Sequence, residues 1–192
     1  MTSPQFLVVG GANGSGKSTT APALLPSPIL YINADEIAKT LPESSGSARD
    51  VQAARLLLAE WNRLENLRED FAVETTLASR TLATRIMRLQ GAGYQFHLVY
   101  LWLSSSDLAV HRVAERVRIG GHDIPEQTIR RRYDSGLRHL FGLYLPLADT
   151  WRIFDNSVAG IPRLVATGAR NHVQSVEIVE VWTAMKGKRA DE

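Results

Sequence analysis

The feature that most restricts the fold of this chain is a glycine-rich segment close to its N-terminus. Its residues are Gly11, Ala12, Asn13, Gly14, Ser15, Gly16, Lys17 and Ser18. They match the phosphate-binding pattern G-x-x-x-x-G-K-[ST], which is meaningful between a buried strand and a helix. Residues 6–10 are apolar, and the residues after the segment are compatible with a helix. The sequence therefore predicts a P-loop within an α/β fold.

In a P-loop, backbone N–H groups point inward at phosphate oxygens, and glycine lets the backbone approach these oxygens closely. We expect Lys17 to contact the β- and γ-phosphates of ATP and Ser18 to coordinate Mg²⁺. Thr19 adds a hydroxyl for the α-phosphate. The side chain of Lys17 is expected to be exposed in an empty cleft. A glycine turn followed by a surface lysine is the alternative interpretation.

Strand-like and helix-like segments alternate along the rest of the chain. After residues 6–10, the predicted core strands are residues 29–33, 71–73, 94–103 and 151–155. Parallel neighbours need crossover connections, so the alternation predicts helices on both faces of the sheet. We expect a three-layer α/β/α fold of the P-loop NTPase type, with a mostly parallel five-stranded sheet like that of nucleoside-monophosphate kinases. A small C-terminal hairpin should turn at residues 169–171.

Composition and charge narrow the function classes. The sequence has no cysteine, which excludes a disulfide framework and a thiolate metal site. No stretch approaches the roughly 18 apolar residues of a membrane span, and the first residues do not have the pattern of a signal peptide. A net charge of +2 does not favour nucleic-acid binding. We expect one cytoplasmic domain without membrane contact over residues 1–185, followed by a disordered tail over residues 186–192.

Acidic residues follow three of the predicted strands. Asp35 comes after the second strand, Glu74 after the third and Asp155 after the last. Glu74 stands where a P-loop enzyme commonly keeps an acid that holds Mg²⁺ or its waters. Asp35 is a candidate general base for the attacking hydroxyl. Asp35 could also cap the helix that follows it, and the two roles are compatible.

Arginines before a glycine pair at residues 120–121 predict a lid over residues 112–125. Arg112, Arg116 and Arg118 lie in this region, and helical spacing places the first two on one face. Like charges at that spacing repel each other unless an anion binds between them. The lid would carry guanidinium groups to the γ-phosphate when it closes. A solvated helix face is the alternative interpretation.

Other ionisable residues have a plain structural explanation. The basic run at residues 130–132 is more typical of a solvated helix face than of a binding site, and lining an acidic substrate is its alternative role. His122 in the glycine-rich hinge either joins the lid or stabilises the turn. His97 lies inside a predicted strand, where packing is its expected role.

Together these features resemble the zeta-toxin family of P-loop kinases, in its short, stand-alone branch. The segments that carry the resemblance, beside the P-loop and residues 33–35, are residues 72–77, 113–118, 120–125 and 155–157. The resemblance implies a kinase that uses ATP or GTP. The implied acceptor is a hydroxyl of a UDP-linked N-acetyl amino sugar such as UDP-N-acetylglucosamine, whose phosphorylation blocks cell-wall synthesis. It also implies an antitoxin as a protein partner.

The resemblance implies roles for individual residues as well. Asp35 would be the base that activates the sugar hydroxyl, and Glu74, Thr76 and Arg80 would hold the substrate. Among the lid arginines, Arg116 and Arg118 would neutralise the transferred phosphoryl group. Asn156, after the last core strand, would border the nucleotide base.

Other functions use the same loop, base and lid. The acceptor in that case is another sugar, a nucleotide or another metabolite. A different class is a nucleotide-dependent switch or slow ATPase that recruits a protein partner. A third alternative, a kinase of polynucleotide ends, would use the basic run at residues 130–132, but the near-neutral charge argues against it.

Overall fold

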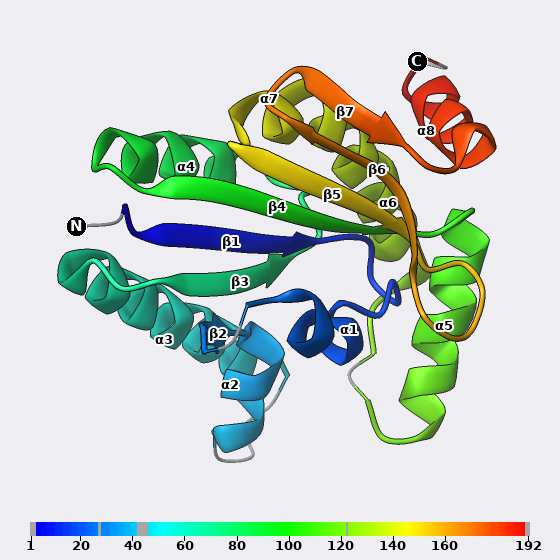
Figure 1. The fold of residues 1–192 in the computed structure, drawn as a ribbon. Coiled ribbons are helices and arrows are strands. Elements are labelled where there is room, and N and C mark those ends of the chain that lie inside the picture. The colour runs from blue at the N-terminus through cyan, green and yellow to red at the C-terminus, as the bar shows by residue number, and fades with distance from the viewer. Residues whose placement is uncertain (1–2, 27, 42–45, 122, 191–192) are drawn as a thin grey trace.

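The computed structural model describes residues 3–26, 28–41, 46–121 and 123–190, and this part of the chain forms one central sheet (Figure 1). The strands lie in the order β2-β3-β1-β4-β5-β6-β7. Their bounds are β1 (Gln5–Gly10), β2 (Leu30–Ile32), β3 (Phe71–Thr75), β4 (Gln95–Trp102), β5 (Thr150–Asp155), β6 (Arg163–Ala169) and β7 (His172–Val176). The first five strands in this order are parallel, and β6 and β7 are antiparallel to their neighbours.

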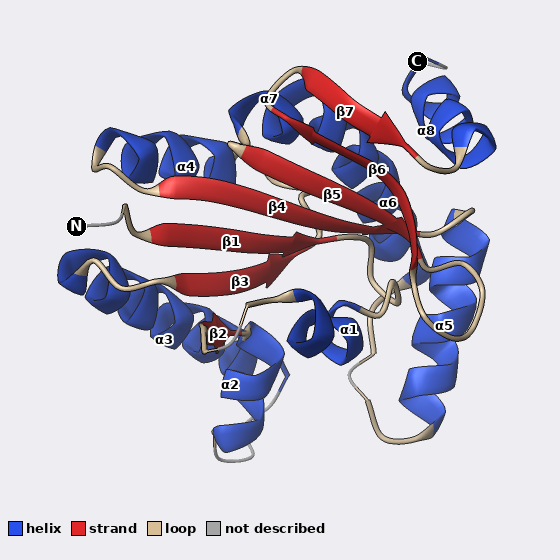
Figure 2. Cartoon of the chain, viewed as in Figure 1, coloured by secondary structure: helices blue, strands red, loops and turns tan. Residues whose placement is uncertain are grey.

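Helices cover both faces of the sheet (Figure 2). They are α1 (Lys17–Leu24), α2 (Ala34–Thr40), α3 (Gly46–Leu67), α4 (Thr81–Gly91), α5 (Ser106–Arg118), α6 (Glu126–His139), α7 (Leu145–Leu147) and α8 (Val179–Ala190), with a π-helical segment η1 (Leu140–Tyr144). Successive residues of β1 face opposite sides. Val9 packs with Ala21 of α1, whereas Val8 belongs to the cluster that includes Trp61 of α3 and Ile86 of α4. None of the described helices is both long and apolar enough to cross a membrane.

The observed sheet confirms the predicted fold class and extends it. The parallel part β2-β3-β1-β4-β5 is the predicted five-stranded sheet. The C-terminal hairpin also forms, with its turn between Ala169 and His172. It is not a separate unit, because β6 pairs with β5 and continues the same sheet.

The predicted C-terminal tail differs from the structure, because α8 continues to Ala190. Trp182 of α8 stacks on Trp151 of β5 with ring centroids 6.0 Å apart, and Met185 is fully buried. Residues three apart share one face of a helix, so this face is held against the sheet by apolar burial. The lysines and arginine near the end of the helix conceal this contact in the sequence. Residues 191–192 lie outside the described residues.

The strand order places a ligand-binding position at the end of β1. The strand β1 lies between β3 and β4 and is parallel to both. The chain goes from β1 to β2 on one side, and later from β3 to β4 on the other side. In open parallel sheets, ligands bind outside the carboxyl ends of the strands at such a reversal. The P-loop leaves β1 at this end, next to α1 and α5 (Figure 1).

Candidate active site

The glycines of the P-loop are required by conformation and by space. Gly14 and Gly16 have φ values of 76° and 83°, a region that favours glycine. A Cβ atom on Gly16 would lie 2.6 Å from Nδ2 of Asn156, and one on Gly14 would lie 2.8 Å from the carbonyl oxygen of Ala109. The predicted loop therefore forms between β1 and α1, wedged between α5 and the end of β5.

Lys17 is buried, which corrects the expectation of an exposed side chain. Only 7% of Lys17 is exposed, and Nζ donates to the carbonyl oxygens of Gly11 and Ala12, both at 2.8 Å. The ammonium group has lost much of its hydration, and the carbonyls of the loop replace part of it. The carbonyls of Gly11 and Ala12 thus hold the cation at the P-loop. The contact of Lys17 with nucleotide phosphates stays a prediction.

Ser18, Tyr31 and Glu74 converge beside the first turn of α1. Oε2 of Glu74, at the end of β3, accepts hydrogen bonds from Oγ of Ser18 at 2.9 Å and from the hydroxyl of Tyr31 in β2 at 2.5 Å. Nδ2 of Asn33 lies 3.5 Å from Oγ of Ser18. The sequence predicted Ser18 and Glu74 as neighbours of one metal ion, and the structure brings them together. Tyr31 was not predicted.

This cluster fits the ligand chemistry of Mg²⁺. The described part of the chain has no group of three or more His, Asp or Glu residues that could enclose a metal ion. Mg²⁺ does not need such a cage, because it is commonly held by one or two protein oxygens together with substrate phosphates and waters. The hydroxyl of Ser18 and the carboxylate of Glu74 are oxygen ligands of this kind.

The loop after β5 clamps the P-loop from the side. Asn156 is 9% exposed, and its Nδ2 donates to the carbonyl oxygen of Ser15 at 2.8 Å. Arg112 of α5 donates to the carbonyl oxygens of Asn156 at 2.8 Å and Ser157 at 3.1 Å. Arg112, an arginine of the predicted lid, thus has structural contacts with the loop after β5. Asn156 lies at the P-loop, and its predicted contact with the nucleotide base stays a prediction.

Asp155 has a structural role at the same corner. It is 4% exposed and accepts from the hydroxyl of Ser157 at 2.5 Å and from Nη2 of Arg163 at 2.6 Å. Burial alone would raise the pKa of Asp155, but the hydrogen bonds from Ser157 and Arg163 outweigh it and hold the pKa below its usual value. The carboxylate is thus ionised and used within the β5–β6 connection.

Arg132 is a candidate site residue from the basic run for which the sequence favoured a solvated helix face. Its Nη1 lies 3.4 Å from Oδ1 of Asn13 in the P-loop. Gly136, one turn further along α6, lets this helix pack closely on the segment after β3, because a Cβ atom there would lie 2.4 Å from the carbonyl oxygen of Thr76. Glycine inside a helix costs about 1 kcal/mol relative to alanine, so its place here points to a packing reason. Gly136 was thus a signal in the sequence that α6 packs closely on another segment.

The predicted substrate residues lie at the end of β3 and on its connection to α4. Glu74 and Thr76 are partly buried, and Arg80 is exposed at the start of α4. Nε of Arg80 is 3.5 Å from Nε2 of His139 in α6, and Nδ1 of His139 is 3.0 Å from the carbonyl oxygen of Leu77. The ends of α6 and β3 therefore face each other across the carboxyl edge of the sheet.

For most of the remaining predicted residues the structure gives the backbone position but fewer side-chain contacts. Asp35 is the second residue of α2, and the buried Asn33 directly precedes this helix. Asn33 thus holds the position before the helix that the capping alternative gave to Asp35. The side chain of Asp35 and all of His122 lie outside the described structure. Thr19 is exposed in α1. Arg116 and Arg118 lie in the last turn of α5, and their contact with a phosphoryl group stays a prediction.

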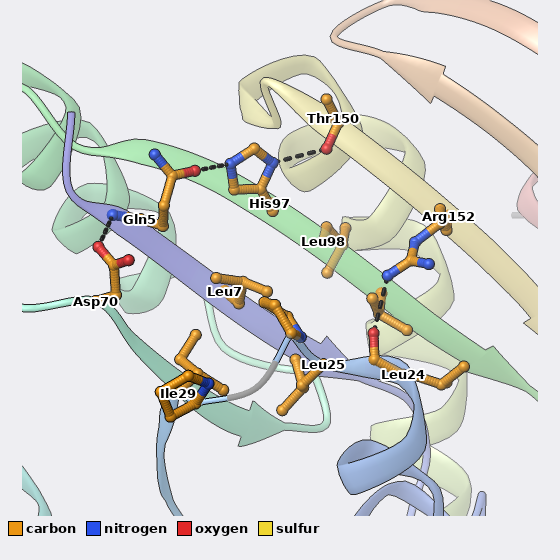
Figure 3. Close-up of a pocket in the computed structure, with 13 residues that line it drawn as sticks. Gln5, Leu7, Leu24, Leu25, Ile29, Asp70, His97, Leu98, Thr150 and Arg152 are labelled. Atoms are coloured by element: carbon orange, nitrogen blue, oxygen red, sulfur yellow. Dashed lines mark hydrogen bonds between the residues drawn. The ribbon is translucent and has the colours of Figure 1, made fainter. Parts of the chain in front are cut away.

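A cavity of about 590 Å³ lies at the other end of the strands (Figure 3). Helix α1 ends at Leu24, so the face of the sheet beyond it is covered by the connection from α1 to β2. Gln5 and Thr150, the first residues of β1 and β5, line the cavity. Nη2 of Arg152 donates to the carbonyl oxygen of Leu24 at 2.9 Å. None of the predicted site residues lines this cavity.

His97 in this cavity predicts a pH effect on stability. Its ring nitrogens lie 2.7 Å from Oγ1 of Thr150 and 2.5 Å from Oε1 of Gln5 (Figure 3). Burial lowers the pKa of His97, and Arg152 adds to this against the opposing charge of Asp149. The unfolded chain, with a His pKa near 6.5, then binds the proton more readily than the folded chain. Stability should therefore fall as the pH drops below about 6.5.

Thermal unfolding between pH 5 and pH 8 checks this expectation. The wild type should lose melting temperature below about pH 6.5, and His97→Gln should lose less over the same interval. His172→Gln, at an exposed position of β7, is the matched control and should follow the wild type. Equal pH dependence of His97→Gln and the wild type would contradict the assignment.

Comparisons with known proteins agree with this geometry. The family model described as Zeta toxin matches residues 1–158. An uncharacterized protein of Haemophilus influenzae is 28% identical over 123 residues, which cover 64% of this chain and 88% of that protein.

Solved structures share the fold. A chain of the native AvrRxo1-ORF1:-ORF2 complex has a TM-score of 0.77 at 14% identity, covering 99% of this chain, and the same complex with ATP has a TM-score of 0.76 at 15% identity, covering 97%. This chain spans 66% and 64% of the length of those two chains. A chain of the PezAT toxin-antitoxin system of Streptococcus pneumoniae has a TM-score of 0.63 at 15% identity, with 98% of this chain and 86% of that chain covered. With 158 of its 192 residues matched, the chain belongs to the Zeta toxin family of P-loop kinases.

Proposed function

We propose that this chain transfers the terminal phosphoryl group of ATP or GTP to a hydroxyl of a small molecule, with Mg²⁺ as the metal ion. The observation that carries the proposal is the P-loop, with Nζ of Lys17 bonded to two of its carbonyl oxygens and Ser18 bonded to Glu74. Membership of the Zeta toxin family supports an ATP-dependent phosphotransferase. An ATP complex among the structures of similar fold supports the nucleotide.

Different residues of the chain have different roles in this proposed reaction. Backbone N–H groups of the P-loop and Lys17 bind and orient the phosphates. Ser18 and Glu74 would hold Mg²⁺, which when bound neutralises charge on the phosphates. Asp35, in the first turn of α2, would accept the proton of the attacking hydroxyl. Phosphoryl transfer depends mainly on such positioning and charge neutralisation.

For the acceptor we propose a nucleotide sugar such as UDP-N-acetylglucosamine. The carboxyl end of β3 and the loop after it support a polar acceptor, because Glu74, Thr76 and Arg80 follow one another there. The backbone of Thr76 and the side chain of Arg80 lie against α6. A sugar offers several hydroxyls that these side chains can bind. A different metabolite with a hydroxyl could bind at the same end of β3. A test of the acceptor therefore includes nucleotide sugars and other hydroxyl compounds.

A protein partner is a further part of this proposal. Two of the structures with a similar fold come from a complex with a second protein, AvrRxo1-ORF2, and from a toxin-antitoxin system. By analogy we propose that an antitoxin binds this chain and restrains its kinase activity. Co-purification of the chain with the product of a neighbouring gene would support this part, and full activity in the presence of that product would contradict it.

Labelled ATP, Mg²⁺ and a panel of acceptors test the proposed reaction. The panel contains UDP-amino sugars, other nucleotide sugars, free sugars and an oligonucleotide, and mass spectrometry identifies any phosphorylated product. We expect a product in the nucleotide-sugar group and slow ATP hydrolysis without an acceptor, because closure around the substrate excludes water. Rapid ATP hydrolysis that no acceptor changes would favour the nucleotide-dependent switch instead.

Arg132 gives a prediction that separates two arginines of one helix. Its guanidinium lies beside Asn13 of the P-loop, where it can bind a phosphate oxygen of the bound nucleotide. Arg132→Ala should lower the rate of phosphoryl transfer about 10- to 100-fold, as expected for the loss of a charge-assisted hydrogen bond. Arg131→Ala, at the exposed neighbouring position, should keep the rate. Equal rates for the two variants would remove Arg132 from the site.

A further inference from the structure

The hydroxyl of Tyr31 makes a short contact that the P-loop motif does not explain. Tyr31 is the central residue of β2, which pairs in parallel with β3. Its hydroxyl donates to Oε2 of Glu74 at 2.5 Å, the same oxygen that accepts from Ser18 at 2.9 Å. One carboxylate oxygen therefore receives two hydroxyl donors from two different elements.

This arrangement fixes the side chain of Glu74. A glutamate at the end of a strand has several rotamers, and ordering such a side chain costs up to about 2 kcal/mol of conformational entropy. Tyr31 is partly buried and has only two side-chain torsions, so its hydroxyl is held at a defined place. A hydrogen bond to an ionised acceptor is among the stronger ones in proteins. Tyr31 can therefore hold Glu74 in the rotamer that reaches α1.

The position of Glu74 decides how Ser18 presents its oxygen. When the hydroxyl hydrogen of Ser18 points at Glu74, the lone pairs of Oγ point away from Glu74. A metal ion needs such a lone pair, and a preorganised ligand binds it with less loss of freedom. Residues behind the direct metal ligands commonly change metal affinity 10- to 100-fold in this way.

We propose that Tyr31 is a positioning residue that sets the Mg²⁺ affinity of the nucleotide site by holding Glu74 against Ser18. This inference rests on the proposed function, because it requires a nucleotide and Mg²⁺ at the P-loop. In this role Tyr31 would not be a metal ligand. Its action passes through the carboxylate of Glu74.

Tyr31→Phe tests this role because it removes only the hydroxyl. ATP binding is measured by calorimetry over a series of Mg²⁺ concentrations and again in EDTA. We expect the Mg²⁺ concentration for half-maximal enhancement of ATP binding to rise about tenfold in the variant. ATP affinity in EDTA should be the same as in the wild type. Tyr94→Phe, which removes a hydroxyl that contacts the carbonyl oxygens of Leu64 and Glu69, is the matched control and should bind like the wild type.

A second variant tests whether Tyr31 affects Mg²⁺ binding through Glu74. In a Glu74→Gln background, Tyr31→Phe should cause little further change in the Mg²⁺ dependence, because the partner carboxylate is already absent. The same Mg²⁺ dependence in Tyr31→Phe and wild type would overturn the inference, as would a full tenfold effect that persists in the Glu74→Gln background. If the wild type bound ATP without any response to Mg²⁺, the proposed function would fail together with this role. Mg²⁺-dependent binding that Tyr31→Phe leaves unchanged would overturn the role of Tyr31 alone.

Discussion

Replacement of Lys17 by alanine is expected to weaken ATP binding by roughly 30-fold to several thousand-fold. The estimate corresponds to truncating one partner of a largely buried charged contact, which costs about 2–5 kcal/mol. The structure adds a second effect, because Nζ of Lys17 also bonds to the carbonyl oxygens of Gly11 and Ala12. Removing a donor from such buried carbonyls costs about 1–3 kcal/mol. Lys17→Ala should therefore lower both the ATP affinity and the thermal stability of the nucleotide-free protein.

Calorimetry with ATP and Mg²⁺, together with thermal unfolding with and without the nucleotide, measures both effects. Lys186→Ala is a suitable control, because the ammonium group of Lys186 lies 5.5 Å from the ring centroid of Trp182, on the C-terminal helix α8. This control should keep the ATP affinity of the wild type. An equal rise in melting temperature with ATP in Lys17→Ala and wild type would contradict the role of Lys17 in nucleotide binding.

Asp35→Asn is expected to lower phosphoryl transfer by about 10²–10⁴-fold, the usual contribution of a general base. The amide keeps the size of the side chain but cannot accept the proton of the attacking hydroxyl. Asp35 lies in the first turn of α2, two residues after Asn33, whose Nδ2 is 3.5 Å from Oγ of Ser18. This backbone position is compatible with a base near the P-loop. Nucleotide binding should stay close to that of the wild type.

Single-turnover kinetics with the identified acceptor separates chemistry from binding in this test. Glu36→Gln, one residue further along α2, removes a neighbouring carboxylate and should retain most of the rate. If the rate of Asp35→Asn equalled that of the wild type, another residue would have to act as the base. Equal losses in both variants would indicate a general electrostatic effect of α2 instead.

Interactions that are local in sequence were predictable. The P-loop depends on consecutive residues, so its glycines, Lys17 and Ser18 could be assigned from the pattern alone. The parallel core strands were predictable because apolar runs alternate with helical patterns along the chain. Parallel neighbouring strands are joined by such crossover helices. Helix α8 was missed, since its apolar face becomes evident only when Trp182 meets Trp151.

Contacts between distant segments were not predictable in the same way. Whether the side chain of Lys17 is buried or exposed depends on which atoms its ammonium group contacts. The motif does not specify these atoms. Arg132 reaches Asn13 across 119 positions of the chain, and Tyr31 reaches Glu74 across 43. The periodicity of a helix or strand gives the face of a residue but not the partner that this face meets.

The sequence by itself determined that a phosphate-binding loop follows the first strand of a parallel α/β sheet, because both depend on the order of residue types along the chain. The tertiary structure alone decided which side chains surround that loop. It paired Tyr31 with Glu74 and brought Arg132 of α6 to Asn13. The physical reason is that hydrogen bonds and charges act over a few ångströms in space, and only packing of the sheet and its helices sets those distances.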